Sequence, residues 1–436
     1  MRLLKFKEIV SLVPILKINR GMAKELGITN GMKVKLCYGM RETLVTANLG
    51  DAYKQETVSI DGETAEKLGI EMPAEYTCSL RRNGLLIGPV IGVLYGIRNS
   101  KGMVDKIKSF PERYLPYFKA VSETGGLLYF FSGDQVNYKD KKITGIVYDF
   151  PSDSWKVKDL PFPAVIFRRV KAPPELLSAM GTRFVNFPCM NKITFWHTFN
   201  SHPILGKHLP QTSRKIEKSE LDAYLKKYGS VFLKQSGRSR GRGIFLITKQ
   251  GSTYEVRVTY EERIYTYSEK EIAILLSKHQ KNFMLQQAVA VKKVDGRPIA
   301  YRVNAVKNES GKWMIAAIHG LSGKREGITS HRATDDNVHN GEEMLKAQFH
   351  FSSAEARGKL KEMEALGLLL AKELNALCPR LIDLGIDMGI DENGDIYLFE
   401  SNTLQDLHLP VLAGEIETYE KLVATIVKTL LAKAME

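Results

Sequence analysis

Two carboxylates and one amide lie close together in a stretch near the end of the chain, LGIDMGIDENGDIYLFESNT. Asp387 is expected at the end of one strand, and Asn393 with Gly394 predicts a tight turn into a returning strand that carries Glu400 and Asn402. Alternation along a strand places Glu400 and Asn402 on one face, and antiparallel pairing brings Asp387 alongside. Such hard oxygen ligands suit Mg²⁺, which takes its remaining ligands from water and phosphates. The pattern therefore predicts a magnesium site, and the alternative is a surface hairpin whose acids are merely solvated.

A glycine-rich basic stretch, KQSGRSRGRG, runs from Lys234 to Gly243. Apolar runs on both sides predict strands, so the stretch closes a hairpin and differs from a Walker loop, which must lead into a helix. Its small residues leave backbone N–H groups accessible to phosphates, and its lysine and arginines supply positive charge. We expect a lid over nucleotide phosphates. The alternative, an Arg-rich segment that binds nucleic acid, is less favoured because such segments are disordered and this one is held between strands.

Two strand-like stretches between these motifs carry further polar groups. One apolar run ends in Gln286 and Gln287, and the turn at Ala288 and Val289 would suit a backbone hinge that pairs with the edge of an adenine. In the other stretch, Arg302 is expected to project from the strand face opposite its apolar neighbours.

The segments that must position these groups form the last part of the chain. Residues 186–436 have the pattern of a single α+β unit, in which serines three residues before an acidic residue predict helix starts at Ser219, Ser268 and Ser352. The last of these opens a long amphipathic helix, whose apolar stripe is expected to pack in the core: Leu360, Met363, Leu366, Leu370, Leu374 and Leu377.

Two smaller units are expected ahead of this one. Residues 1–82 form a β-rich pattern in which two similar phrases, AKELGITNGMKVKL and AEKLGIEMPAEYTCSL, indicate a duplicated, barrel-like half. Residues 83–185 alternate buried apolar runs with helical stretches, which predicts an α/β layer with parallel strands. That region has no G-x-G-x-x-G fingerprint, so a dinucleotide site is not indicated there.

The composition is that of a globular protein with an anionic partner. Hydrophobic residues make up 44% of the chain, charged residues 26%, and the formal net charge is +14. The four cysteines form no C-x-x-C pair, so reduced thiols are expected and neither a zinc site nor a disulfide framework is indicated. No secretory h-region and no apolar run of about 18 residues occurs, so we predict a cytoplasmic protein without a membrane span.

These pieces, in this order, resemble the ATP-grasp superfamily over about residues 186–410 and, over nearly the whole chain, the endospore coat-associated YheC/YheD family, with a length nearer its YheD branch. The resemblance implies a fold class of α/β and α+β. In it, an ATP-grasp domain (186–436) follows an α/β pre-grasp domain (83–185) and a small N-terminal β-rich domain (1–82). It also implies ATP and Mg²⁺ as cofactors and, besides the cytoplasm, the spore coat as a location.

The resemblance also assigns roles to individual residues. Asp387, Glu400 and Asn402 correspond to metal ligands, with Glu400 bridging two ions, and Arg302 would stabilise the transferring phosphoryl group or the acyl intermediate. The residues that correspond to ATP contacts come from an Asn-Lys pair, a strand lysine, the glycine-rich loop and the hinge: Lys192, Lys234, Gly237, Ser239, Gly241, Gly243, Gln286, Gln287, Ala288 and Val289.

The implied reaction is amide formation between a carboxylate and an amine through an acylphosphate, with ADP and phosphate released. The positive charge favours an acidic peptide or a coat protein as acceptor, and a paralogous partner subunit could complete the site. The chain departs from the family pattern at Ala300, where an Asp is common, and near Leu321, where an Arg is common. The alternative is therefore a coat-associated structural protein that binds ATP with little or no ligase turnover.

Overall fold

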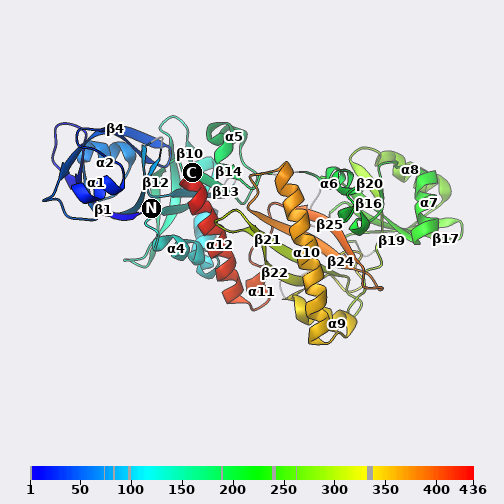
Figure 1. Cartoon of the computed structure of the whole chain (residues 1–436). Coiled ribbons are helices and arrows are strands. Elements are labelled where there is room, and N and C mark those ends of the chain that lie inside the picture. Colours follow the sequence, from blue (N-terminus) through cyan, green and yellow to red (C-terminus); the bar gives the residue numbers. More distant parts are fainter. Residues whose placement is uncertain are drawn as a thin grey trace.

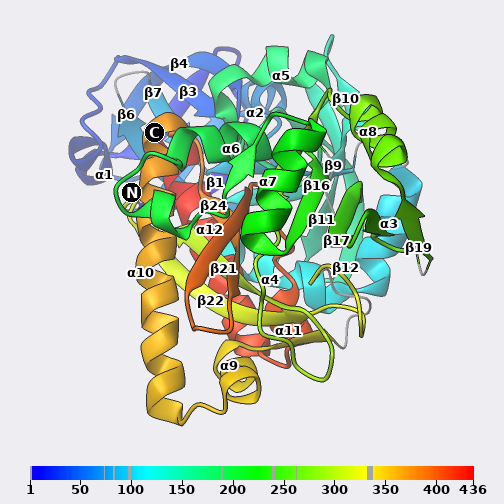
Figure 2. The same ribbon diagram turned by 90° about the vertical axis from the view of Figure 1, so that its right-hand side faces the viewer.

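The computed structural model describes residues 2–72, 74–81, 84–96, 100–187, 190–237, 242–261, 263–330 and 337–436. The chain forms an elongated molecule with a β-barrel at one end and a six-stranded sheet at the other (Figure 1). Figure 2 views the molecule from the end of the six-stranded sheet, with the barrel at the back. Between these ends lie an α/β sheet and a five-stranded sheet.

Seven strands at the N-terminus close into a barrel in the order β1-β5-β2-β4-β3-β7-β6. The similar phrases of the sequence form two strand–helix–strand units, β2–α1–β3 and β5–α2–β6, and each helix is capped by the residue before it, Asn19 or Asp61. The duplication expected from the sequence is therefore present in the fold. The elements are β1 (Arg2–Ile9), β2 (Ile15–Asn19), α1 (Arg20–Glu25), β3 (Lys33–Tyr38), β4 (Arg41–Gly50), β5 (Thr57–Asp61), α2 (Gly62–Leu68), β6 (Ala74–Arg81) and β7 (Gly84–Ile87).

The α/β layer that follows is a mixed sheet, in which β8, β9, β13 and β14 are parallel. The prediction of parallel strands is wrong for the run TGIVYDF, because β11 pairs antiparallel with both β9 and β12. The turn between β11 and β12 is short, and so permits only a hairpin. The elements are β8 (Val90–Gly96), α3 (Ser100–Ser109), α4 (Pro111–Ser122), β9 (Leu127–Ser132), β10 (Val136–Asn137), β11 (Lys142–Asp149), β12 (Ser154–Pro161), β13 (Val165–Arg168), α5 (Pro174–Met180) and β14 (Phe184–Val185).

A six-stranded antiparallel sheet in the order β15-β20-β16-β17-β18-β19 carries the glycine-rich hairpin. Helices α7 and α8 cover one face of this sheet, where Leu221, Leu225, Ile272 and Leu276 join the strands in one apolar cluster. The elements are α6 (Lys192–Phe199), β15 (Thr212–Ser213), α7 (Lys218–Tyr228), β16 (Ser230–Gln235), β17 (Ile244–Gln250), β18 (Thr253–Val258), β19 (Ile264–Tyr267), α8 (Glu269–Lys278) and β20 (Phe283–Gln287).

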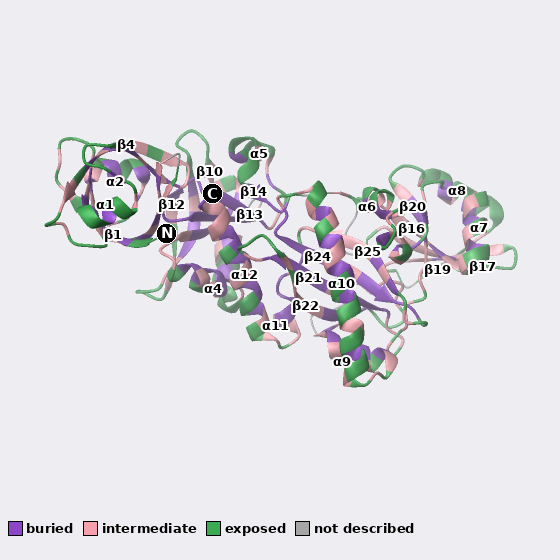
Figure 3. Ribbon diagram, in the orientation of Figure 1, coloured by how far each residue is buried: buried purple, intermediate pink, exposed green. Residues whose placement is uncertain are grey.

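The five-stranded sheet, in the order β23-β22-β21-β24-β25, lies between two long helices. Helix α10 packs on one face of β21 through Met363, Leu366 and Leu370, and α12 packs on the other face and against α4 of the α/β layer. In Figure 3 the strands β21 and β24 are largely buried, whereas α10 has one buried side and one exposed side. The elements are β21 (Ile299–Lys307), β22 (Trp313–Ser322), β23 (Val338–Asn340), α9 (Gly341–Phe349), α10 (Ser353–Leu377), β24 (Asp383–Ile390), β25 (Ile396–Asn402), α11 (Leu409–Leu412) and α12 (Ile416–Ala434).

Two of the three predicted helix starts are confirmed. Ser268 and Ser352 each form a complete capping box, at α8 and α10. The start predicted at Ser219 is wrong: α7 begins one residue earlier, after Glu217, and it has no side-chain cap. Apolar burial of Leu221 and Leu225 holds this helix in place without a cap.

The structure also tests two predictions made from composition, the reduced cysteines and the lack of a membrane span. Cys37 and Cys78 are free, as expected, whereas Cys378 is disulfide-bonded, so the prediction of a reduced thiol is wrong there. Cys189 lies outside the described residues. Within the described ranges, no helix combines the length and the apolar character needed to cross a membrane.

Candidate active site

The predicted metal residues lie in one row across three adjacent strands. Arg302 of β21 is directly opposite Asp387 of β24, and Asp387 is directly opposite Glu400 of β25. Asn402 follows two positions after Glu400 and therefore lies on the same face. The convergence of Asp387, Glu400 and Asn402 predicted from the sequence is confirmed.

The turn that joins these strands forms as its sequence predicts. Gly394 has φ +88°, a conformation that glycine adopts without strain, and its N–H donates to the Asp391 carbonyl. The Asp391 carboxylate accepts from the N–H groups of Asn393 and Asp395, both at 2.9 Å. From this turn the strands pair in step as far as Met388 and Leu398, and a register shift between Asp387 and Met388 then places Glu400, rather than Phe399, opposite Asp387.

Arg302 binds Asp387 with two nitrogen atoms. Its Nε donates to Oδ1 at 2.6 Å and its Nη2 to Oδ2 at 3.2 Å, and both side chains are largely buried. The neighbours Val303 and Ala305 pack on the α10 side of the sheet, so Arg302 projects from the opposite face, as predicted. Burial raises the pKa of Asp387, Arg302 opposes this shift, and the charge of Glu400 adds to it.

Glu400 binds a lysine from a distant helix. The Nζ of Lys192, the first residue of α6, lies 2.5 Å from Glu400 Oε2. Asn191 caps that helix by accepting from the N–H of Thr194 at 2.9 Å, which holds Lys192 at the start of the first turn. Burial would raise the pKa of Glu400, but Lys192 outweighs it and the pKa is lowered.

Asn402 connects the two carboxylates. Its Nδ2 donates to Asp387 Oδ2 at 3.0 Å and to Glu400 Oε1 at 3.1 Å. The carboxylate oxygens are therefore bound by two cationic side chains of the protein and by one amide N–H group. A divalent cation that entered would displace these nitrogen groups from the oxygens. Two carboxylates and an amide that can turn its oxygen inward fit Mg²⁺. No cluster of three or more His, Cys, Asp or Glu side chains suited to a metal occurs in the described part of the chain.

Lys234 lies near the end of β16 and makes no ion pair with a carboxylate among the described contacts. Its Nζ donates to Gln286 Oε1 at 2.8 Å and lies 4.5 Å from the centre of the Phe232 ring and 5.9 Å from that of Phe399. Burial, together with the charge of Lys192, lowers the pKa of Lys234 to about 8. A buried ammonium group without a paired carboxylate is suited to bind an anion such as a phosphate.

The hinge and the glycine-rich loop adjoin Lys234. The N–H groups of Gln287 and Ala288 donate to carbonyls of Gln211 and Ser230, whereas among the described residues the N–H of Val289 donates to no protein group. The side chain of Gln286 is buried and already bonded at both ends, with Oε1 accepting from Lys234 and Nε2 donating to Thr212 Oγ1 at 2.9 Å. Of the predicted hinge donors, Val289 is thus the one available to a ligand.

The glycine-rich stretch closes the β16–β17 hairpin, as predicted, with Lys234 opposite Ile244. Gly237 is exposed with open space around it, and Gly243 has φ +68°. Both glycines therefore allow a ligand to approach the backbone closely. The predicted contacts Ser239 and Gly241 lie outside the described residues.

Several residues of this region carried no usable signal in the sequence. Thr212 belongs to a strand of only two residues, and Phe399 resembled an ordinary strand residue although its ring lies beside Lys234. Strict alternation puts Phe399 on the face opposite Glu400, whereas the register shift between β24 and β25 brings its ring over Gly389, on the Asp387 side of the sheet.

The comparisons with known proteins show the family of the chain. A family model described as YheC/D like ATP-grasp matches residues 181–430. The endospore coat-associated protein YheD of Bacillus subtilis (strain 168) is 28% identical over 337 residues, which cover 72% of each chain. The endospore coat-associated protein YheC of the same organism is 20% identical over 281 residues, 60% of this chain and 76% of that protein. D-alanyl-alanine synthetase A from Vibrio cholerae matches 79% of this chain and 98% of its own, with 14% identity and a TM-score of 0.44.

Proposed function

Because the chain belongs to the YheC/D-like ATP-grasp family, we propose that it is an ATP- and Mg²⁺-dependent ligase that joins a carboxylate to an amine. The observation that carries this proposal is the row of Asp387, Glu400 and Asn402, which binds Arg302 and Lys192. A third cation, Lys234, lies beside Phe399 of the same strand as Glu400. Carboxylates suit a metal ion, and lysines and an arginine suit the phosphates that such an ion accompanies.

We expect Asp387, Glu400 and Asn402 to hold Mg²⁺, which when bound neutralises the charge of the polyphosphate. Lys234, with its lowered pKa, and Lys192 would bind phosphate oxygens, and the Val289 N–H would bind the base. Arg302 lies at one end of the row, beside Asp387, where its guanidinium can stabilise negative charge that develops on the transferring group.

The proposed chemistry has two steps. A carboxylate oxygen of the first substrate attacks the γ-phosphorus of ATP, and the bond between this phosphorus and the β–γ bridging oxygen breaks to leave ADP and an acylphosphate. The amine nitrogen of the second substrate then attacks the acyl carbon, phosphate leaves with the bonding electron pair, and the nitrogen loses its proton to solvent. The protein contributes positioning and charge stabilisation in both steps.

The formal net charge of +14 favours an acidic peptide as acceptor, and the names of the two relatives suggest a coat protein as its source. Peptides of equal length with acidic, neutral and basic sequences test this choice at low salt, where electrostatic attraction is strongest. We expect the acidic peptide to be modified most rapidly. Equal modification of all three would exclude selection by charge.

The positions that depart from the family pattern support a second candidate, an ATP-binding coat-associated protein with little turnover. Ala300 and Leu321 are direct partners across β21 and β22, so two expected polar groups are replaced by one apolar pair. This pair lies on the strand face that carries Arg302, two positions away.

One experiment separates the two candidates. The purified protein is incubated with ATP, Mg²⁺ and a panel of amino acids and acidic peptides, and ADP, phosphate and product mass are measured. A ligase gives ADP, phosphate and an amide-linked mass gain, all absent in Glu400→Ala. Nucleotide binding without turnover, together with coat assembly that survives Glu400→Ala, would favour the structural candidate.

A further inference from the structure

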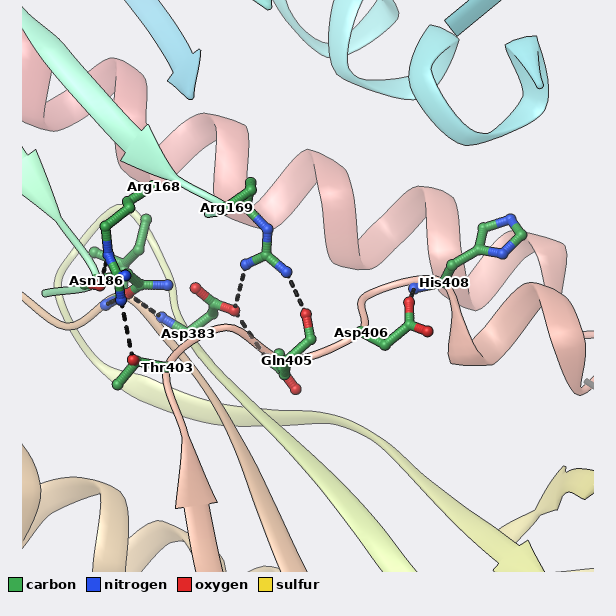
Figure 4. A network of polar contacts seen from close by, with 9 residues as sticks. Arg168, Arg169, Asn186, Asp383, Thr403, Gln405, Asp406 and His408 are labelled. Atoms are coloured by element: carbon green, nitrogen blue, oxygen red, sulfur yellow. Dashed lines mark hydrogen bonds and ion pairs between the residues drawn. The ribbon is translucent and has the colours of Figure 1, made fainter. Parts of the chain in front are cut away.

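A buried polar network joins the α/β layer to the metal-binding strands. Arg168 ends β13 and Arg169 follows it (Figure 4). Their partners from other segments are Asn186, the first residue of β24, and two residues of the segment that follows β25. Except for Asn186, each of these partners lies more than two hundred positions after the arginine that it binds. The network is separate from the phosphate and metal contacts proposed above.

Arg169 holds two segments with one guanidinium. Its Nη1 donates to Asp383 Oδ2 at 3.2 Å, and its Nη2 donates to the carbonyl of Gln405. The side chain of Gln405 closes the triangle, because its Nε2 donates to the same Asp383 oxygen at 3.0 Å. The Arg169 side chain is 9% exposed and that of Asp383 is 0% exposed, so neither group can exchange its partner for water.

Arg168 and Asn186 hold the same two segments from the other side. Arg168 donates to the Asn186 carbonyl at 2.8 Å and to the hydroxyl of Thr403 at 3.2 Å. The Asn186 side-chain oxygen accepts from the N–H groups of Ile382 and Asp383, at 2.8 and 3.2 Å. Asp383 begins β24, which carries Asp387, and Thr403 directly follows Asn402.

Gln405 connects this network to Arg302. The Cβ of a side chain at Gly385 would lie 2.7 Å from the Gln405 Cβ and 3.0 Å from the Arg302 Cδ. Gln405 and Arg302 therefore meet over the backbone of Gly385, in space that only glycine leaves free. Gly385 is paired with Asn402 in the sheet, and Arg302 binds Asp387, so the contacts lead from Arg169 to both ends of the metal row.

We propose that Arg169 and Asp383 are positioning residues, which hold β24 and the segment after β25 at the spacing that Mg²⁺ binding by Asp387, Glu400 and Asn402 requires. This inference rests on the proposed function. It makes the α/β layer part of the metal site although that layer supplies none of the proposed ligands. Groups that orient ligands from outside commonly change metal affinity 10- to 100-fold when they are altered.

The substitution Arg169→Lys tests the proposal, because it keeps the positive charge but cannot bind Asp383 and the Gln405 carbonyl together. We would measure ADP binding by calorimetry as Mg²⁺ is titrated, and repeat the measurement with EDTA. The expected result is that half-maximal ADP binding needs about 10-fold more Mg²⁺ than in the wild type, with binding in EDTA unchanged.

Arg380→Lys is the matched control. Arg380 also joins the two parts of the molecule, by donating to the Gly181 carbonyl at 3.1 Å, but this hydrogen bond is exposed to solvent. We expect wild-type Mg²⁺ dependence in this variant. In a double-mutant cycle of Arg169→Lys with Asp383→Asn, the two effects on Mg²⁺ dependence should be clearly non-additive, since both changes break the same contact.

The outcomes separate this inference from the proposed function. Wild-type protein that binds ADP without any Mg²⁺ dependence would overturn the proposed metal site itself. A Mg²⁺-dependent wild type with an Arg169→Lys variant that has lost only thermal stability would overturn the positioning role alone. If Arg169→Lys does not fold, the nearly isosteric Asp383→Asn carries the same test, and unchanged Mg²⁺ dependence in that variant overturns the inference.

Discussion

The two halves of the candidate site differ in how their charges are balanced. In the carboxylate half, Asp387 and Glu400 each bind a cation of the protein itself, Arg302 and Lys192. In the lysine half, the contacts of the Lys234 ammonium group among the described residues are a neutral amide and two aromatic rings. One half is neutralised before a ligand arrives and the other awaits an anion, so we expect the first to respond to metal and the second to phosphate and pH.

The largest effect is expected from Glu400→Gln, which keeps the shape of the side chain and removes its charge. The variant loses both the Lys192 ion pair and a metal ligand, and groups outside the ligand set already change metal affinity by about 10- to 100-fold, so turnover should fall by at least about 100-fold. Phosphate release at saturating ATP and Mg²⁺ measures this. Glu362→Gln, an exposed change on α10, is the control, and a Glu400→Gln rate close to that of the control contradicts the assignment.

Arg302→Met should destabilise the fold, because it leaves the Asp387 carboxylate buried without its cation. We expect the free energy of unfolding to fall by about 3 kcal/mol, as for other broken buried pairs. Denaturant titration measures the loss. Adding Asp387→Asn should recover much of it, since no charge is then left unpaired, and an equal or larger loss in the double variant would show that the pair is not what stabilises β21 against β24.

Lys234 should make nucleotide affinity depend on pH. Its pKa is lowered to about 8, so the ammonium form is largely present at pH 7 and is lost as pH rises through 8. If bound phosphate keeps the lysine protonated, ADP affinity should be about 10-fold lower at pH 9 than at pH 7, since one pKa unit corresponds to about 1.4 kcal/mol. Lys234→Arg should bind with little change over this range, and a wild-type profile equally flat would remove Lys234 from the phosphate contacts.

The smallest effects are expected at the helix caps that support each half. Ser352→Ala removes the capping box of α10, which packs under the carboxylate half, and Ser268→Ala removes that of α8, beside the lysine half. Each should lower the free energy of unfolding by about 1 kcal/mol and leave ADP affinity unchanged. A change of affinity in only one variant would show which half is coupled to the stability of its supporting helix.

Short-range patterns predicted much of this site from the sequence. The register shift that sets Asp387 opposite Glu400 carried no such pattern. Period two, however, was enough to place Glu400 and Asn402 on one face, and the Asn393 and Gly394 turn closes the hairpin within a few residues. The capping boxes at Ser268 and Ser352 are equally local. Local hydrogen bonds decide such features, and the surrounding fold changes them little.

Contacts between distant segments could not be predicted in the same way. Nothing in the residues around Lys192 indicates that it reaches Glu400, and Arg169 meets Asp383 across 214 positions of sequence. The antiparallel β11 was predicted as parallel because a buried strand reads the same in either direction. These features depend on how whole layers pack, and a single sequence carries no pattern for that.

The most direct test of the account is the calorimetric affinity of ADP with Mg²⁺ and with EDTA, for the wild type and for a double variant, Asp387→Asn with Glu400→Gln. We predict that the wild type binds ADP at least about 10-fold more tightly with Mg²⁺, and that the double variant binds with the same affinity in both conditions. A double variant that folds and keeps the wild-type difference would contradict the assignment of these two carboxylates as the metal site.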